Sequence, residues 1–490
     1  MKQTFFIIAT LFFLCSCSEK ETIISGTIIG NEDKVIYSNP KGGTCFSGFR
    51  DTVSVDENGN FELKLTLKQP SFVELWTSQT GKGVKLLLEE GKKYHILINV
   101  ENDNIPEISG DNEDGQRLYS SLPNPSFMSQ QNRELQKENS IAVISEKIQE
   151  MKSEELKQFQ KMLDESKISK SFFELIKIDR DCYYASLESR IIQIKIYGST
   201  PNEKGEYILD NGENLLESLD KIYTQYPPNK SDFLISSFSP EYIEFFIKDY
   251  VTIQENYNME KLMDLYEKGQ LHTFYIDLSK KYIDGRLLEF FQASYIYKAS
   301  IQKRFEKELI SLFEQFEKDY PQSEYTKYMK PYIDEIIDYH AKIEMDYGDE
   351  ISFIEQFDNI NTFKKLVSSL AGKKIYIDIW ATWCGPCKRE FQHSEELKKV
   401  LKENDTQMLY VSIDTEEKDS HWREMIKYYN LEGKHIRTNK KLLEELVTMY
   451  DEKSKSISIP WYILIDEEGN IIKKHAKRPS EIISGGNIFD

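Results

Sequence analysis

Apolar and polar residues alternate with a period of two from residue 20 to about residue 110. Every odd position of 61–67 is apolar, and so is every even position of 94–100. This alternation predicts half-buried strands. Between the strands, segments such as 56–60 and 89–92 supply the Asn and Gly residues that tight turns favour. Short strands at this spacing predict an antiparallel β-sandwich over residues 17–112.

The pattern changes to helical spacing from residue 113 to residue 345, where apolar residues recur every three or four positions. Prolines interrupt it at 123–125, at 227–228 and at Pro321, and proline ends a helix or opens the next one. No repeat of fixed period is visible. We therefore expect a central α-helical region whose many aromatic residues form packing cores rather than a ligand site.

A third pattern follows the acidic segment 344–350, where strand-like and helix-like stretches alternate. Such alternation predicts a central sheet covered by helices, which is an α/β domain, over residues 351–490. The expected strands are 375–380, 408–413, 461–465 and one from Ile471, and the expected helices are 387–403, 420–429 and 441–450.

The first sixteen residues have the pattern of an export signal, with Lys2 before a short apolar stretch. The following Leu14-Cys15-Ser16-Cys17 resembles the lipobox of bacterial lipoproteins, which implies that Cys17 is lipidated and becomes the new N-terminus. Cys15 does not fit, because bulky residues precede it. The alternative is a plain secretory signal with two incidental cysteines.

Composition and charge narrow the possible partners. The 490 residues carry a formal net charge of −19 that is spread along the chain, which disfavours nucleic acid and anionic membrane surfaces. No other apolar run approaches the roughly 20 residues that cross a bilayer. The lipid on Cys17 is therefore the only membrane attachment that we expect.

A dithiol motif, Trp383-Cys384-Gly385-Pro386-Cys387, lies between a predicted strand and a predicted helix. Together with Ile377-Asp378-Ile379-Trp380 before it, this motif resembles the thioredoxin family signature, and the following Lys388-Arg389-Glu390-Phe391 resembles its TlpA-like branch. The strand-rich segment 20–110 resembles, more diffusely, the β-sandwich that often precedes such domains in bacterial lipoproteins. The resemblance implies a thioredoxin fold.

The two cysteines are the predicted redox-active pair. A two-residue spacing at a helix start lets their sulfur atoms form a disulfide. Cys384, at the helix N-terminus, should have a stabilised thiolate and act as the nucleophile. Cys387 lies one turn further into the helix and should resolve the mixed disulfide.

Two acids are candidate proton-transfer groups. Asp378 matches the family position of a buried acid beneath the dithiol, where desolvation raises the pKa of a carboxyl group. The alternative is an Asp that caps a sheet edge. Glu390 matches an acid near the dithiol in TlpA-like relatives, and its alternative is a solvated residue on a helix surface.

Trp383, Ile459 and Pro460 are the expected substrate-binding residues. The resemblance implies a cis peptide bond at Ile459-Pro460, facing the dithiol and presenting the Ile459 backbone to a substrate chain. An ordinary trans proline at the start of a strand is the alternative. The chain departs from the family at 480–486, which is short and contains two glycines, so the last helix is expected to be short or missing.

We expect no metal and no cofactor. Cys384 and Cys387 are not accompanied by a second pair of ligands at zinc spacing. A peroxidase site would need Thr or Ser where Ala381 stands. Cys45 and Cys182 are expected to be buried small residues, although a disulfide between them stays open.

These observations predict a thiol-disulfide oxidoreductase that faces the periplasm, is anchored to a membrane of the cell envelope through Cys17, and reduces or isomerises disulfides in exported proteins. Because that compartment is oxidising, its electrons would come from a membrane donor. The alternative is a lipoprotein that binds a ligand or partner through the first 345 residues and in which the dithiol is secondary.

Overall fold

The computed structural model describes residues 20–30, 32–38, 45–46, 50–67, 69–122, 130–354, 359–370, 372–451 and 456–489. The chain divides into two compact units, residues 1–334 and 335–490. The division falls inside helix α12 (Thr326–Ile343), before the acidic segment 344–350. Each unit is described separately.

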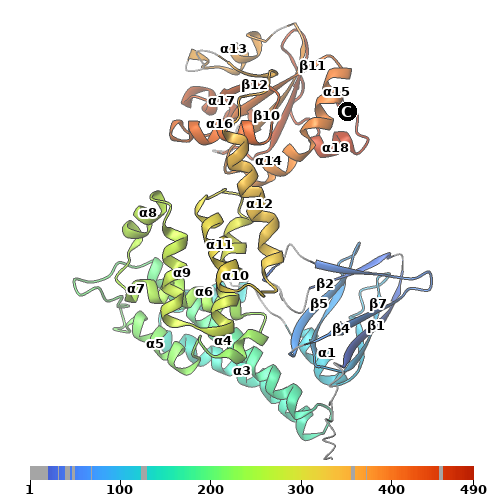
Figure 1. Ribbon diagram of the computed structural model, residues 1–490, viewed down its shortest axis with the longest axis vertical. Coiled ribbons are helices and arrows are strands. Elements are labelled where there is room, and N and C mark those ends of the chain that lie inside the picture. Colours follow the sequence, from blue (N-terminus) through green and yellow to red (C-terminus); the bar gives the residue numbers. More distant parts are fainter. Residues whose placement is uncertain are drawn as a thin grey trace, which may run out of the picture. The chain divides into compact units, whose positions relative to one another are not determined.

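The N-terminal unit begins with two four-stranded sheets (Figure 1). Their strands are β1 (Glu21–Ile29), β2 (Lys34–Ser38), β3 (Arg50–Ser54), β4 (Asn60–Thr66), β5 (Ser71–Thr77), β6 (Gly83–Leu88), β7 (Lys93–Asn99) and β8 (Glu107–Gly110). One sheet has the order β4-β1-β7-β8 and the other β3-β2-β5-β6, and apolar side chains from both sheets form one buried cluster. Alternation along β1 and β4 turns every second residue inward, and Ile24, Ile28, Phe61 and Leu63 belong to this cluster.

One strand pairing differs from the prediction. The sequence predicted an antiparallel arrangement, but β1 and β7 are parallel neighbours, with Ile23 opposite Lys93 and Ile29 opposite Asn99. Parallel strands need a long connection, and five strands lie between these two in the chain. Periodicity reports which residues are buried but not which strand lies alongside, so this pairing was not visible in the sequence.

The rest of the N-terminal unit is helical, as predicted. Its elements are α1 (Glu113–Ser121), α2 (Gln130–Lys137), α3 (Ile141–Asp164), α4 (Lys170–Tyr197), α5 (Leu215–Gln225), the 3-10 helix η1 (Ser231–Ile235), α6 (Ser239–Phe245), the π-helix η2 (Phe246–Val251), α7 (Thr252–Gln254), α8 (Met259–Glu267), α9 (Leu271–Tyr282), α10 (Gly285–Ser300), α11 (Glu308–Asp319) and the start of α12.

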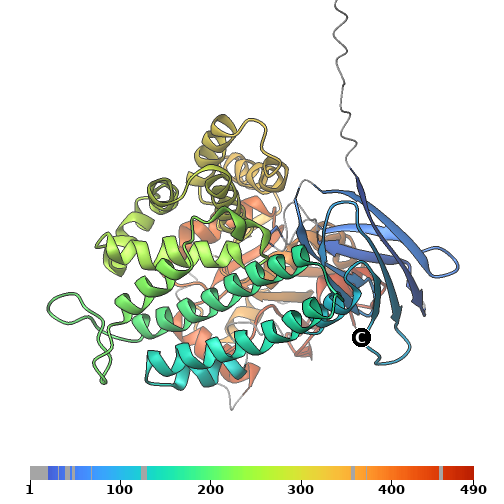
Figure 2. The ribbon, with the colours of Figure 1, turned by 90° about the horizontal axis from the view of Figure 1, so that it is seen from below.

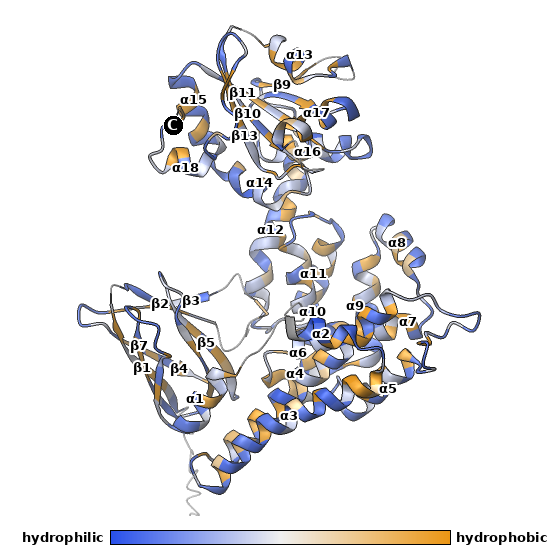
Figure 3. Cartoon of the chain, turned by 180° about the vertical axis from the view of Figure 1, so that it is seen from behind, coloured by the Kyte–Doolittle hydropathy of each residue, from blue (hydrophilic) through white to orange (hydrophobic). Residues whose placement is uncertain are grey.

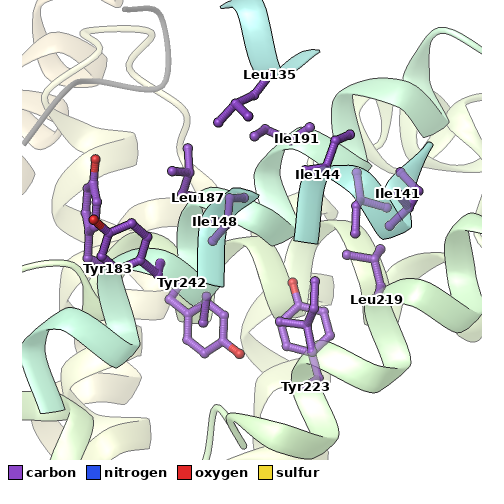
Figure 4. Packing of buried hydrophobic residues seen from close by; sticks show 14 of the residues in the cluster. Leu135, Ile141, Ile144, Ile148, Tyr183, Leu187, Ile191, Leu219, Tyr223 and Tyr242 are labelled. Carbon is purple, nitrogen blue, oxygen red and sulfur yellow. The ribbon is translucent and has the colours of Figure 1, made fainter. Parts of the chain in front are cut away.

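Helix α4 is the centre of the helical region. Side chains around its whole circumference are buried, which is the pattern of a helix enclosed by others. The long helices α3 and α4 lie side by side (Figure 2), and each is capped by a serine, Ser140 and Ser169, whose hydroxyl accepts a backbone N–H. Isoleucines of α3 and leucines and tyrosines of α4, α5 and α6 meet between them (Figure 4). In contrast, hydrophilic and hydrophobic residues are interspersed along α3 and α5 (Figure 3), and the exposed ones are mostly polar.

The C-terminal unit contains one six-stranded sheet of order β14-β13-β10-β11-β12-β9. Its elements are β9 (Ile351–Phe353), α13 (Phe363–Ser368), β10 (Lys374–Trp380), α14 (Gly385–Glu390), the 3-10 turn η4 (Phe391–His393), α15 (Ser394–Glu403), β11 (Thr406–Ser412), the 3-10 turn η5 (Glu416–Lys418), α16 (Asp419–Tyr428), β12 (Gly433–Arg437), α17 (Lys440–Tyr450), β13 (Trp461–Ile465), β14 (Ile471–Lys473) and α18 (Pro479–Ile483).

The elements predicted for this unit are confirmed within a few residues, and β9, α13 and β12 are additional. Strand β10 is central, with β11 parallel to it on one side and β13 antiparallel on the other. Helices α13 and α17 pack on one face of the sheet, and α15 and α18 pack on the other. The last helix is short, as expected, with five residues, and its Ile482 is buried against the sheet together with Ile488.

Candidate active site

Cys384 and Cys387 form a disulfide at the start of α14. Cys384 is the N-cap residue of this helix, and its Sγ accepts a hydrogen bond from the backbone N–H of Cys387 at 3.1 Å. Such a donor would also stabilise a thiolate at Cys384 after reduction. Both cysteines are buried in the disulfide form, with Cys384 3% exposed and Cys387 fully buried.

The loop that carries the dithiol is fixed by a carboxylate from the next strand. Asp414 accepts hydrogen bonds from the backbone N–H and the hydroxyl of Thr382, at 2.9 and 2.8 Å. The hydroxyl of Ser412, at the end of β11, also donates to Asp414 at 2.8 Å. The sequence did not predict this buried contact, for which the only signal is an acid directly after the predicted strand 408–413.

The two tryptophans beside the motif have different environments. Trp380 is fully buried and its ring contacts Phe391 edge to face, with 5.1 Å between the centroids. Trp383 is 66% exposed directly before Cys384. An exposed aromatic ring offers a substrate chain a large and rigid contact surface, so the role predicted for Trp383 is compatible with its position.

Asp378 lies in the interior of the sheet and is 1% exposed. Its register partners are Tyr410 on β11 and Tyr462 on β13, so it does not cap a sheet edge. Within the described part of the chain its Oδ1 atom has no hydrogen-bond partner. Burial, and secondarily the nearby Glu390 carboxylate, raises the pKa of Asp378 well above its ordinary value.

Glu390 is buried at the end of α14 rather than solvated. Its carboxylate accepts hydrogen bonds from the backbone N–H of Ser480 at 3.0 Å and from the Ser480 hydroxyl at 3.1 Å. Ser480 belongs to α18, so the short terminal helix holds the second acid of the site. The sequence could not show this pairing across ninety positions.

The peptide bond between Ile459 and Pro460 is cis. Strand β13 begins at the next residue, Trp461, which lies opposite Ile379 on β10. Because the two strands are antiparallel, the start of β13 meets the end of β10 that leads into the dithiol loop. Ile459 and Pro460 therefore lie at the same end of the sheet as the loop that carries the two cysteines.

The remaining predicted site residues lie elsewhere. Cys17 is outside the described residues. Cys45 and Cys182 are both free thiols; Cys182 is buried as expected, whereas Cys45 is only partly buried. Among the helices in the described part of the chain, none has the length and apolar character of a membrane span.

Comparison with known proteins agrees with this geometry. Residues 358–484 match the Redoxin family. The chain is 28% identical over 103 residues to thiol-disulfide oxidoreductase ResA of Bacillus thuringiensis, covering 21% of this chain and 54% of that protein. It is 40% identical over 48 residues to ResA of Oceanobacillus iheyensis, covering 10% and 25%. The chain thus spans about half the length, or less, of these curated relatives.

A comparison with solved structures gives a partial match. The thioredoxin domain of a thiol-disulfide oxidoreductase from Bacteroides vulgatus is 20% identical, with a TM-score of 0.21 over 24% of this chain and 79% of that one. The residues that match the Redoxin family lie within the C-terminal unit, which holds the dithiol. Residues 358–484 of this chain thus match the Redoxin family, and part of the chain is similar in sequence to thiol-disulfide oxidoreductases.

Proposed function

We propose that this protein is a thiol-disulfide oxidoreductase that reduces or isomerises disulfides in exported proteins through Cys384 and Cys387. The observation that carries the proposal is the disulfide at the start of α14 in a unit where a carboxyl group, Asp378, is buried without a hydrogen-bond partner among the described residues. A structural disulfide needs no such acid, whereas proton transfer during dithiol exchange does.

The exchange proceeds in two steps. The Cys384 thiolate attacks one sulfur of a substrate disulfide, which forms a mixed disulfide and releases one substrate thiolate. The Cys387 thiolate then attacks the Cys384 sulfur, which releases the second substrate thiolate and leaves the Cys384–Cys387 disulfide. Two electrons pass to the substrate, and a dithiol donor must reduce the protein again.

Asp378 is the proposed acid and base of the second step. Its raised pKa keeps the carboxyl group able to exchange protons closer to neutral pH than an exposed Asp. It would accept the proton of the Cys387 thiol before attack. Glu390 is the proposed positioning acid, because its charge raises the pKa of Asp378. Trp383, Ile459 and Pro460 are the proposed contacts for the substrate chain.

The proposed location is the periplasmic side of the cell envelope, with Cys17 as the lipid anchor. The lipobox-like sequence supports the anchor. The proposed electron donor is a membrane protein with a dithiol, because an oxidising compartment offers no soluble reducing pool. Exported proteins with disulfides are the proposed substrates.

An insulin-reduction assay, together with the redox potential of the dithiol, tests the proposal. We expect reduction by the wild-type protein and its loss in Cys384→Ser, whereas Cys45→Ser, a matched change in the N-terminal unit, keeps full activity. A Cys387→Ser variant should trap mixed disulfides with substrate proteins. A potential near about −120 mV, the range of strong oxidants, would reverse the proposed direction of electron flow.

A further inference from the structure

The N-terminal unit contains a cavity of about 800 Å³, within the size range of ligand sites. It lies among the end of α4, the π-helix η2, α7, α8 and α9. Most of its lining is aromatic or apolar, including Tyr197, Tyr257, Tyr266, Tyr275, Met259 and Met263. Such a lining is typical of sites for apolar groups, and methionine and tyrosine adapt to partners of varied shape.

Helix α8 presents an unburied apolar face to this cavity. Met259, Leu262, Met263 and Tyr266 stand at positions i, i+3, i+4 and i+7, which places them on one side of the helix. All four line the cavity, yet no residue of α8 is buried, and Met259 is 65% exposed. An amphipathic helix normally buries this face against a core. Here the face meets an open cavity.

The charged residues of the lining differ in their partners, and one of them, Arg304, is exposed to solvent. Lys248 pairs with Glu244 at 3.2 Å, and Asp249 pairs with Arg190 at 3.8 Å and accepts a hydrogen bond from the Tyr197 hydroxyl. Arg304 also lines the cavity, and within the described ranges it has no ion-pair or hydrogen-bond partner. A guanidinium group in such a place favours a carboxylate from a ligand.

The backbone around the cavity has unusual conformations. Lys303 and Phe305, on either side of Arg304, have left-handed φ values of 52° and 58°, which non-glycine residues rarely adopt. The Phe305 side chain is buried and fixes this segment. The lining also includes residues of the π-helix η2, and π-helical turns are frequent at functional sites. Strain of this kind persists where the surrounding structure holds it.

We propose that this cavity binds an extended, acidic and aromatic segment of a client polypeptide. Its aromatic or aliphatic side chains would enter the cavity and meet the apolar face of α8, while a carboxylate would pair with Arg304. Met259, Met263 and Tyr266 line the cavity and are also exposed to solvent, so they can contact an occupant that extends beyond the cavity, as a polypeptide does. The identity of the occupant as a client rests on the proposed function, because a protein oxidoreductase acts on polypeptides.

The test is fluorescence anisotropy with the full chain and a fluorescein-labelled twelve-residue peptide that contains two Phe, one Leu, two Asp and no Cys. We expect saturable binding by the wild-type protein. Arg304→Glu and Met263→Asp should each weaken binding at least about tenfold, which is the effect of losing a central contact. Replacing both Asp residues of the peptide with Lys should have a comparable effect.

Two matched variants serve as controls. Lys221→Glu makes a similar change of charge on an exposed position of α5, and Met345→Asp replaces an exposed methionine outside the cavity. Both should bind as the wild-type protein does. The absence of saturable binding, equal weakening by Lys221→Glu and Arg304→Glu, or unchanged binding by Met263→Asp would each overturn the proposal.

The design separates this proposal from the proposed function. The peptide has no cysteine, so its binding does not depend on Cys384 or Cys387. Failure of insulin reduction together with retained peptide binding would overturn the redox function but support the cavity as a polypeptide site. Intact insulin reduction with no peptide binding would overturn only the cavity proposal.

Discussion

The two faces of strand β10 differ sharply although their residues alternate in one seven-residue segment. On one face Ile375, Ile377 and Ile379 pack into an apolar cluster with helices α13 and α17. On the other face Tyr376, Asp378 and Trp380 lie among further aromatic rings beneath α14. One face stabilises the sheet, and the other contains the buried acid of the candidate site.

The difference between the two faces shows that burial alone does not distinguish residues of the apolar core from residues of the candidate site. Both faces are almost completely buried, with exposures of 0 to 1%. The distinction lies in hydrogen bonding, because apolar side chains need no partner whereas a buried carboxyl group does. Asp378 lacks one at Oδ1 among the described residues, and such a group costs stability.

The largest effect on stability is expected on the apolar face. Ile377→Ala should lower the free energy of unfolding of the C-terminal unit by about 2–5 kcal/mol, because it leaves a cavity in a fully buried core. Urea unfolding followed by tryptophan fluorescence measures this, since four of the five tryptophans lie in this unit. The control Ile471→Ala removes an exposed side chain from β14 and should change little.

This prediction would be wrong if Ile377→Ala cost no more than the exposed control. It also sharpens the contrast between the faces, because Ile377→Ala should leave the pH dependence of disulfide exchange unchanged. A changed pH profile would mean that the apolar face takes part in the chemistry.

Much of the C-terminal unit could be predicted from the sequence because its information is local. The alternation in 375–380 and the Trp383–Cys387 motif predict a strand, a turn and a helix start without knowledge of distant residues. The contacts that complete the site are not local. Asp414, which accepts hydrogen bonds from Thr382 in the loop before Cys384, lies 32 positions from Thr382. Ser480, which donates to Glu390, lies 90 positions from it.

The same reason explains what was missed in the N-terminal unit. Periodicity predicted its strands and helices, but the parallel pairing of β1 with β7 depends on which strands become neighbours. The unburied face of α8 has the pattern of any amphipathic helix, so the sequence could not distinguish it from one packed into a core. Only the folded structure shows which apolar faces are left without a packing partner.

A second prediction concerns the acid on the other face. Asp378→Asn should raise the free energy of unfolding at pH 7 by about 1–3 kcal/mol, because the mutant no longer buries an ionisable group without a partner. Folding raises the pKa of Asp378, so above about pH 4 the native state binds more protons than the unfolded state. The free energy of unfolding of the wild-type protein therefore falls as the pH rises from about 4.

Urea unfolding of the wild-type protein and of Asp378→Asn between pH 4 and pH 8 checks this sign. The advantage of the mutant should vanish near pH 4 and grow with pH. The mutation should raise stability but slow disulfide exchange, because an asparagine cannot accept the Cys387 proton. The exchange rate of the mutant should also depend less on pH than that of the wild-type protein. An advantage of the mutant that is equal at both ends of the range would contradict a raised pKa.

The smallest expected effects on stability concern two tyrosines near Asp378, one on β10 and one on β13. Tyr376 and Tyr462 are both buried and their rings stack at 5.5 Å. The Tyr376 hydroxyl donates to the backbone carbonyl of Lys477 at 2.7 Å, whereas the Tyr462 hydroxyl has no partner among the described residues. Tyr376→Phe should therefore cost about 0.5–1.5 kcal/mol, and Tyr462→Phe should be neutral or slightly stabilising.

Both variants remove one oxygen atom from the same face of the sheet, so each is the control for the other. Urea unfolding at pH 7 gives the difference between them. An equal cost for Tyr462→Phe would mean that its hydroxyl is bonded in solution, and Asp378, its register partner on β10, is the polar group placed to receive it. That cost should then increase with pH, because an ionised Asp378 accepts a stronger hydrogen bond than a protonated one.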